Sequence, residues 1–232
     1  MKQLYHYQDL EKLVLEMGFL PFFRNGIPGF SVEEFTPPEL WFTDDTDGPW
    51  EWKGPVVRNW NCVYGKMFGG KAGYVSLDWF PELVNYRRSS YTPAGKEKQI
   101  YDTVVEHESL LSKEVKALCG FSKPRSSSSN PLDSLALRKR KSGEEGYETI
   151  MTRLQMGTYL VIADFEYQYD KQGEPYGWGI ARYTTPEALY GADVVLSRSQ
   201  HSAEESRALL FRHFREILPQ ATEAQIFRII GS

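Results

Sequence analysis

The sequence GYETIMTRLQMGTYLVIADFEYQYDKQGEPYGWGIARY, residues 146–183, decides the fold of this chain. Near its start, apolar side chains recur at the spacing of one helix face, at Tyr147, Ile150, Met151 and Leu154. Gly157 follows them, and glycine is common where a helix ends. The pattern therefore predicts a helix over residues 147–156.

Two strands are predicted to follow this helix. Residues 158–165 are rich in β-branched and aromatic side chains, which favour half-buried strands, and residues 177–183 form a second such run. The polar loop between them, residues 170–175, contains the turn formers glycine and proline. Helix, strand, loop and strand are the second half of a winged helix-turn-helix, in which the two strands form the wing.

The first half of this motif is predicted upstream of the opening helix. Residues 96–107 have a helical pattern, and residues 109–120 predict a second helix with Ser109 as its N-cap. A Ser-rich, basic insertion at about residues 122–145 follows, and its composition favours a solvated segment. Residues 93–191 are thus predicted to form one winged helix-turn-helix with this insertion.

The rest of the chain predicts an N-terminal lobe and a helical C-terminus. In residues 1–92, a helix over residues 9–18, a capping box from Ser31 to Glu34 and a glycine-rich hairpin over residues 61–76 indicate an α/β lobe. Residues 192–232 predict a C-terminal helical segment. We therefore expect an α+β fold of tandem winged-helix-like lobes with short β-hairpins.

Residues 41–60 lack a period and are predicted to form a long tryptophan-rich loop. Two roles fit this composition. The tryptophans can anchor the loop in the core, or Trp50 and Trp52 can wall a pocket with an acid at its rim for acid–base chemistry. The candidate catalytic acids are Asp44, Asp45, Asp47 and Glu51.

The charge of the chain bounds its partners. A net charge of −4 argues against strong nonspecific binding to nucleic acid, because neutralisation of phosphates by Lys and Arg supplies most of that affinity. The distribution is uneven, since residues 1–60 carry ten acids and five bases, whereas residues 113–153 carry nine bases and five acids. The basic excess lies in and just before the opening helix, which leaves an anionic partner there open.

Several classes of protein and site are disfavoured. The chain shows no signal peptide and no run of about 18 apolar residues, so we expect a cytoplasmic protein without a membrane partner. Cys62 and Cys119 stand apart without ligand-spaced histidines, which favours free thiols over a disulfide or a metal site. The glycine-rich hairpin lacks the spacing of a phosphate-binding loop, and no cofactor is expected.

Five blocks of sequence resemble a family of small bacterial proteins grouped as AlkZ-related. They are GKMFGGKAGYVS (65–76), WFPELVNYR (79–87), LLSKEVK (110–116), TRLQM (152–156) and TTPEALYG (184–191). The similarity covers most of residues 18–231 apart from the Ser-rich insertion. The family is named for a distant likeness to the AlkZ and YcaQ DNA glycosylases, which are built of tandem winged helices and excise alkylated or crosslinked purines. The resemblance thus implies winged helices and a link to DNA repair.

The chain departs from those glycosylases at the motif by which they are recognised. That motif is Gln-x-Gln or Gln-x-Asp near the N-terminal winged helix, and no such motif occurs before Arg88. The residues Gln168-Tyr169-Asp170 have these letters but lie at the predicted wing. Glycosylase activity does not follow from the resemblance, since function belongs to the site rather than to the fold.

Three functions are weighed, with an unrelated small-molecule pocket as the remaining alternative. The first is binding of nucleic acid, with double-stranded DNA as the partner, through the opening helix, the wing and the glycine-rich hairpin. Its candidate residues are Thr149, Thr152, Arg153, Lys171, Lys66, Lys71 and Arg87. The second is a DNA glycosylase with a diverged active site in the tryptophan-rich stretch. The third is a non-catalytic scaffold whose wing and tryptophan-rich stretch face a protein partner.

Overall fold

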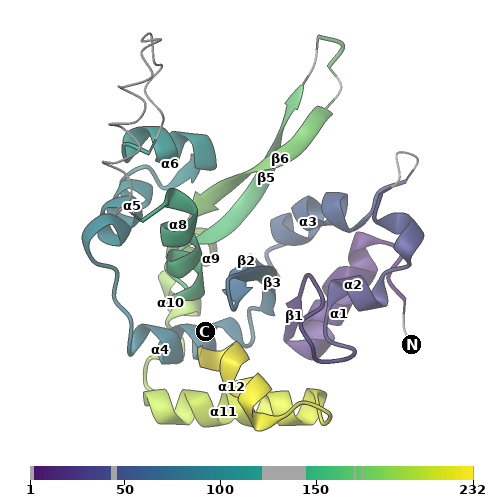
Figure 1. Ribbon diagram of the computed structural model, residues 1–232. Helices are drawn as coiled ribbons and strands as arrows, with labels where there is room; N and C mark the ends of the chain where they lie inside the picture. Colours follow the sequence, from purple (N-terminus) through teal and green to yellow (C-terminus); the bar gives the residue numbers. More distant parts are fainter. Residues whose placement is uncertain (1–2, 43–45, 122–144, 170, 174, 232) are drawn as a thin grey trace, which may run out of the picture.

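Figure 1 shows the computed structural model of the chain, which describes residues 3–42, 46–121, 145–169, 171–173 and 175–231. The helices are α1 (Tyr7–Met17), α2 (Val32–Phe35), α3 (Pro49–Arg58), α4 (Phe80–Arg88), α5 (Gly95–Glu106), α6 (Ser112–Leu118), α8 (Tyr147–Met156), α9 (Pro186–Tyr190), α10 (Ala192–Val195), α11 (Ala203–Ile217) and α12 (Glu223–Gly231), with a 3-10 helix η1 at Pro38–Leu40. The strands are β1 (Phe19–Pro21), β2 (Cys62–Phe68), β3 (Lys71–Ser76), β4 (Ser109–Leu111), β5 (Val161–Tyr169) and β6 (Pro175–Thr184). Within the described ranges, no helix is long and apolar enough to cross a membrane.

The strands form one six-stranded sheet in the order β1-β3-β2-β5-β6-β4, and every neighbouring pair is antiparallel. The order helix, strand, helix, helix, strand, strand occurs twice, in a first repeat (residues 7–76) and a second repeat (residues 95–184). In both repeats the first strand pairs with the third. The predicted α+β class is confirmed, and the two repeats share one order of elements.

The two repeats join at strands β2 and β5, where Tyr64 lies opposite Ile162. Both side chains lie in a core that also contains side chains of α1, α3, α5, α6 and α8. Their neighbours Val63 and Val161 lie in a second core, which contains side chains of α4, α11 and α12. Successive side chains of a strand point to opposite faces, so the sheet is a middle layer with a core on each side.

The hairpins of the two repeats differ in length. Strands β5 and β6 form a hairpin that projects from the body of the protein, as Figure 1 shows. The shorter β2–β3 hairpin turns at Gly69 and Gly70, whose positive φ angles of 59° and 78° favour glycine. The projecting hairpin corresponds to the predicted wing.

The tryptophan-rich stretch is not one long loop, as the sequence predicted, because helix α3 occupies half of it. Pro49 fits the first turn, where its missing N–H costs nothing, and the Glu51 carboxylate accepts the backbone N–H of Gly48 at 2.9 Å. The helical pattern is obscured by Gly54 and Pro55, which helices disfavour. Burial of Trp52 and the two valines after Pro55 in the core stabilises this helix despite its poor propensity.

Residues 109–111 form strand β4, so the prediction of one helix over residues 109–120 with Ser109 as its N-cap was wrong. This strand pairs with β6, where Leu110 lies opposite Tyr183. Helix α6 begins only at Ser112, and the Glu114 carboxylate accepts the backbone N–H of Leu111 at 2.7 Å. Sheet pairing therefore overrides a local pattern that fits a helix equally well.

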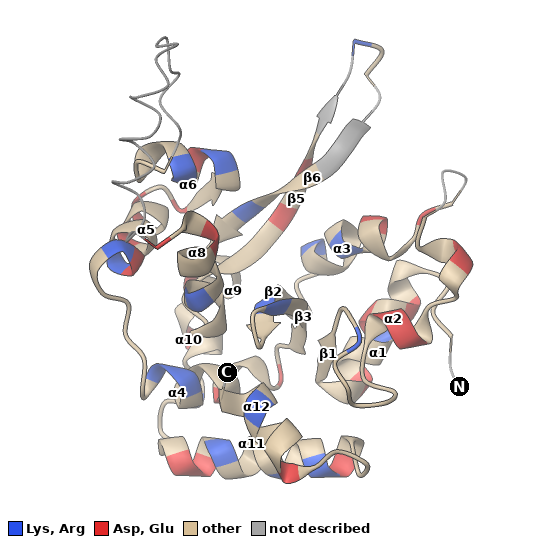
Figure 2. Cartoon of the chain, viewed as in Figure 1, with Lys and Arg blue, Asp and Glu red and all other residues tan. Residues whose placement is uncertain are grey.

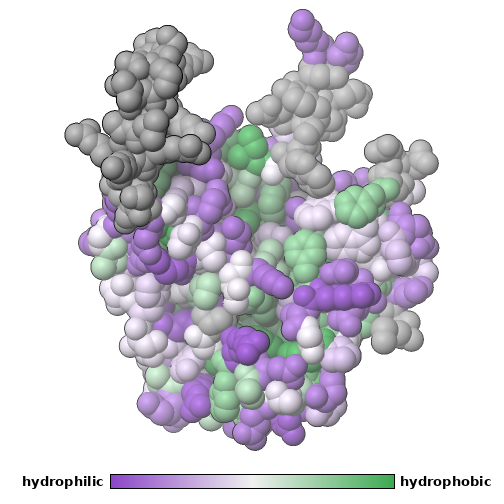
Figure 3. All heavy atoms as spheres, viewed as in Figure 1, coloured by the Kyte–Doolittle hydropathy of each residue, from purple (hydrophilic) through white to green (hydrophobic). Residues whose placement is uncertain are grey.

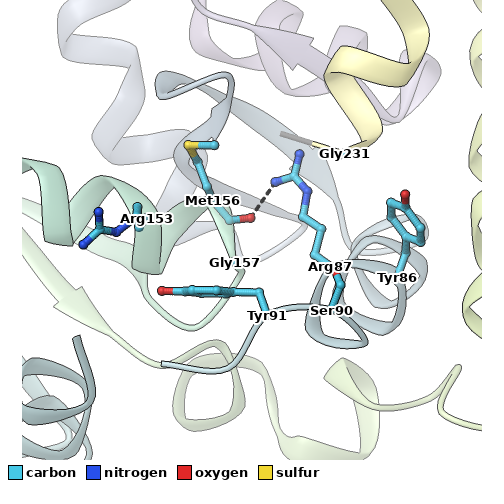
Figure 4. Close-up of a pocket in the computed structure, with 8 residues that line it drawn as sticks. All are labelled: Tyr86, Arg87, Ser90, Tyr91, Arg153, Met156, Gly157 and Gly231. Carbon is cyan, nitrogen blue, oxygen red and sulfur yellow. Dashed lines mark hydrogen bonds between the residues drawn. The ribbon is translucent and has the colours of Figure 1, made fainter. Parts of the chain in front are cut away.

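Arg87 is buried between the sheet and the C-terminal helices. Its guanidinium donates hydrogen bonds to carbonyl oxygens of three other elements: Met67 in β2 (2.9 Å), Met156 in α8 (2.8 Å), and Ile229 (2.7 Å) and Ile230 (3.0 Å) in α12. Figure 4 shows the bond to Met156. Burial lowers the pKa of Arg87, whereas the carbonyl acceptors favour the charged form. A nucleic-acid contact, as predicted for Arg87, does not fit this placement.

Replacement of Arg87 by methionine is expected to destabilise the protein by about 3 to 5 kcal/mol, because it leaves several buried carbonyls without donors. The free energy of unfolding from urea denaturation measures this effect. Arg212→Met on the exposed side of α11 is the matched control, with an expected change within about 0.5 kcal/mol. Equal stability of the two variants would contradict the role assigned to Arg87.

Candidate functional site

Helix α8 is predicted to face a nucleic acid, but part of its surface packs against the β2–β3 hairpin of the first repeat. The Gln155 side chain accepts the backbone N–H of Lys66 at 3.0 Å, and the Lys66 ammonium lies 3.4 Å from the Thr152 hydroxyl. Thr152 also donates to the carbonyl of Glu148 one turn earlier, at 2.7 Å. Lys66 and Thr152 are thus brought together by the fold, in a contact between the repeats.

The charged side chains of α8 are paired within the protein. Arg153 forms an ion pair with Glu97 at 2.5 Å, and its terminal nitrogens contact the carboxylate of Glu145. Glu148 pairs with Lys116 at 2.9 Å and approaches Lys66 at 3.8 Å. Basic and acidic residues accordingly lie close together on this part of the protein, and the ribbon of α8 in Figure 2 has both blue and red segments. A continuous basic surface does not extend along α8.

The other predicted contacts with nucleic acid are exposed but lie apart. Thr149 is exposed on α8, Lys71 is exposed at the start of β3, and Lys171 is exposed at the turn of the projecting hairpin. In Figure 2 the ribbon at the tip of this hairpin has the blue colour of Lys and Arg. Lys171 therefore lies at the turn of the hairpin that corresponds to the predicted wing, and its contact with nucleic acid stays a prediction.

A hollow of 260 Å³ lies beside Arg87, lined by residues of α4, α8 and the end of α12 (Figure 4). Its polar groups are engaged with each other. The Tyr91 hydroxyl donates to Glu97 at 2.8 Å, and Glu97 is also the partner of Arg153. The hollow therefore belongs to the packing around Arg87 and offers few uncommitted groups to a ligand.

A second hollow, of 360 Å³, has aromatic walls and is named here the aromatic pocket. It is lined by Phe23, Arg24, Glu33, Thr36, Pro38, Trp41, Phe42 and Trp50. The rings of Trp41 and Trp50 meet edge to face, with centroids 5.8 Å apart. Phe42 is 85% exposed, which is unusual for so large an apolar side chain. On the face of the protein that Figure 3 shows, hydrophobic residues (green) lie among mostly hydrophilic ones (purple).

Of the two predicted pocket residues, only one lines the aromatic pocket. Trp50 does so, whereas Trp52 is 2% exposed and belongs to the core. The carboxylate of Glu51 accepts the N–H of Gly48 at the start of α3 and thus has a helix-capping role. Asp47 is exposed and does not line the pocket, and Asp44 and Asp45 lie outside the described residues.

Lys53 lies among aromatic rings of both repeats, a feature that sequence reasoning missed. Its ammonium is 4.7 Å from the ring centre of Trp50 and 4.6 Å from that of Phe165 on β5. Beside it, Arg58 of α3 pairs with Asp164 of β5 at 2.8 Å. These five residues are named the α3–β5 junction. The sequence carried no signal for it, because the contacts between α3 and β5 join positions more than a hundred residues apart.

The environment of Lys53 disfavours its charged form. Burial lowers the pKa of Lys53 to about 8 from an ordinary value of 10.5, while the nearby carboxylate of Glu51 acts in the opposite direction. The aromatic faces attract the ammonium but cannot replace the water that it loses. Lys53 is thus an amine with a reduced preference for the protonated state.

The Lys53 environment is expected to make stability depend on pH. Between pH 8 and 10.5 the unfolded chain binds more protons than the folded chain, so the free energy of unfolding rises with pH across this window. Lys53→Met should remove the rise between pH 8 and 9, below the range in which the lowered pKa of Arg87 adds to it, whereas Lys12→Met at an exposed position of α1 should keep it. Urea denaturation at intervals across and below the window measures the difference. Parallel profiles for wild type and Lys53→Met would contradict the lowered pKa.

The part of the chain that the structure describes contains no group of three or more His, Cys, Asp or Glu side chains placed to hold a metal ion. Cys62 and Cys119 are both buried free thiols. The chemistry available at the aromatic pocket and the α3–β5 junction is therefore that of aromatic faces, carboxylates, guanidinium groups and one water-poor amine.

Comparison with known proteins gives a single result. A family model described as AlkZ related matches residues 4–231, which is nearly the whole chain. No curated protein and no solved structure matches the sequence. The chain therefore belongs to the AlkZ-related family.

Proposed function

We propose that this protein binds double-stranded DNA in a DNA-repair context, with the aromatic pocket accepting an unstacked base. The observation that carries the proposal is the aromatic pocket itself, in which Phe23, Trp41, Phe42 and Trp50 surround an open hollow of 360 Å³. Every base has a π face, and stacking on aromatic side chains recognises bases without a sequence code. The family name, with its reference to a DNA glycosylase, points to the same class of partner.

The projecting hairpin supplies the proposed contact with the DNA backbone. Lys171 is exposed at its turn, and Figure 2 shows that the tip of the hairpin lies away from helix α8. In the proposal, the duplex lies along this hairpin and the α3–β5 junction. Helix α8 does not contact the DNA in this proposal, because Arg153 and Glu148 are already engaged in ion pairs within the protein. Of the contacts predicted from the sequence, this proposal retains Lys171. It assigns Arg153 and Thr152 a structural role instead.

Lys171→Ala is expected to weaken binding to duplex DNA of any sequence and to reduce the magnitude of the salt slope by about 1, since one phosphate contact is lost. Fluorescence polarisation with a labelled duplex at several salt concentrations measures both quantities. Lys12→Ala, an exposed lysine on α1, is the control and should leave the slope unchanged. An unchanged slope for Lys171→Ala would remove the hairpin from the interface.

A duplex with one unpaired, bulged base is expected to bind more tightly than a fully paired duplex, because less energy is needed to unstack that base. Phe42→Ala should lower the ratio of the two affinities about tenfold. Such a loss lies within the range of about 1 to 3 kcal/mol for stacking of one base. Its stability should change little, since the side chain is 85% exposed. Phe227→Ala on α12 is the aromatic control. A preference that survives in Phe42→Ala would place the base elsewhere.

Docking of another protein is the second candidate, and the acidic charge of the chain together with the exposed Phe42 favours it. The same titrations separate the two candidates. Failure to bind any duplex at low salt would favour the protein partner. Release of an alkylated base, followed in the same tubes, would instead favour a glycosylase, and individual replacement of Asp44, Asp45, Asp47 and Glu51 would then locate its acid.

A further inference from the structure

Lys53 stands out among the described lysines because several aromatic rings surround its ammonium group. The rings come from three separate segments: Phe22 after β1 at 5.9 Å, Trp50 of α3 at 4.7 Å and Phe165 of β5 at 4.6 Å. Other described lysines have at most one such ring, as Lys116 has with Tyr147. The two repeats thus build an aromatic enclosure around one amine.

The amine forms no ion pair in the part of the chain that the structure describes, and the nearby carboxylate of Glu51 raises its pKa less than burial lowers it. Lys66, Lys98 and Lys116 form ion pairs with carboxylates, and none of the ion pairs between described residues includes Lys53. A carboxylate partner would hold the amine protonated, whereas loss of water to apolar rings favours the neutral form. Lys53 is nevertheless partly exposed, so a small group of a ligand can reach it.

The position of Lys53 connects it to the aromatic pocket through Trp50. This ring lines the pocket, and its centre lies 4.7 Å from the Lys53 ammonium. A base stacked in the pocket brings the neighbouring sugars of its strand toward the same helix, including one that has lost its own base. The flexible stem of a lysine allows its nitrogen to move by several ångströms toward such a group.

We propose that the Lys53 amine forms an imine with an aldehyde of its ligand, the group that a DNA sugar presents once its base has been lost. The DNA source of the aldehyde rests on the proposed function above. The neutral nitrogen attacks the carbonyl carbon, a C–N bond forms, and the nitrogen gives its proton to the carbonyl oxygen through solvent. Loss of water then leaves the imine, so that amine and aldehyde give imine and water without any other reactant.

Reductive trapping tests this step on the wild-type protein. The protein is incubated with cyanoborohydride and a duplex that contains an abasic site, and the attachment point is mapped by mass spectrometry of its peptides. We expect attachment at Lys53 at a rate on the order of tenfold above that of any other lysine. A duplex with a tetrahydrofuran abasic analogue has no aldehyde and should give no adduct. An adduct spread evenly over the surface lysines would overturn the proposal.

Variants and a small aldehyde separate the possible failures. Lys53→Arg keeps a cation between the rings and should abolish trapping, whereas Lys12→Arg should not; circular dichroism verifies that both are folded. Binding of the tetrahydrofuran duplex is measured separately. If this duplex does not bind, the proposed DNA binding is contradicted, but imine formation is not. Modification of Lys53 by glyceraldehyde but not by the abasic duplex would overturn DNA as the source of the aldehyde. Absence of selective modification by either reagent would overturn the imine itself.

Discussion

The buried guanidinium of Arg87 is the interaction on which the arrangement of the whole chain depends. Carbonyls at the ends of helices lack intrahelical donors and carry a partial negative charge, so a cation among them is stabilising. Arg87 supplies that cation from α4 to the last residue of α8 and to the end of α12, and it also reaches β2. One side chain therefore ties the first repeat, the second repeat and the C-terminal helices together.

This constraint has a consequence for the surface that is left to a partner. With β2, α8 and α12 fixed to one another, the β2–β3 hairpin of the first repeat is held against α8, where Lys66 contacts Gln155 and Thr152. The part of α8 that bears Thr152 and Gln155 is thus occupied by the first repeat. The exposed features that remain on the other side are the β5–β6 hairpin and the aromatic side chains around α3. Strands β2 and β5 hold equivalent places in the two repeats and pair antiparallel, so helix α3 of the first repeat contacts β5 just as α8 of the second repeat contacts β2.

The sequence predicted those parts of the fold that local patterns determine. Helix α8 and the capping pair Ser31–Glu34 depend on neighbours within a few residues, and the structure contains them. Strand β4 and helix α3 could not be predicted, since pairing with β6 and burial of Trp52 decide them over long sequence separations. The same limit applies to the site: Trp50 was found by its residue type, while Lys53 and Phe165 meet only in the folded chain.

An acidic protein that binds DNA needs a source of affinity besides charge. Phosphate contacts by Lys and Arg are opposed here by the net charge of −4 and by the ion pairs that neutralise α8. Stacking on a ring depends on the π face and on removal of water, and it is insensitive to net charge. In the proposed interface, selection therefore falls on bases that are already unstacked, because intact duplex offers no face to Phe42 or Trp50. The same exclusion of water that favours stacking also lowers the pKa of Lys53, so recognition of a disrupted site and reactivity of the amine arise from one cluster of rings.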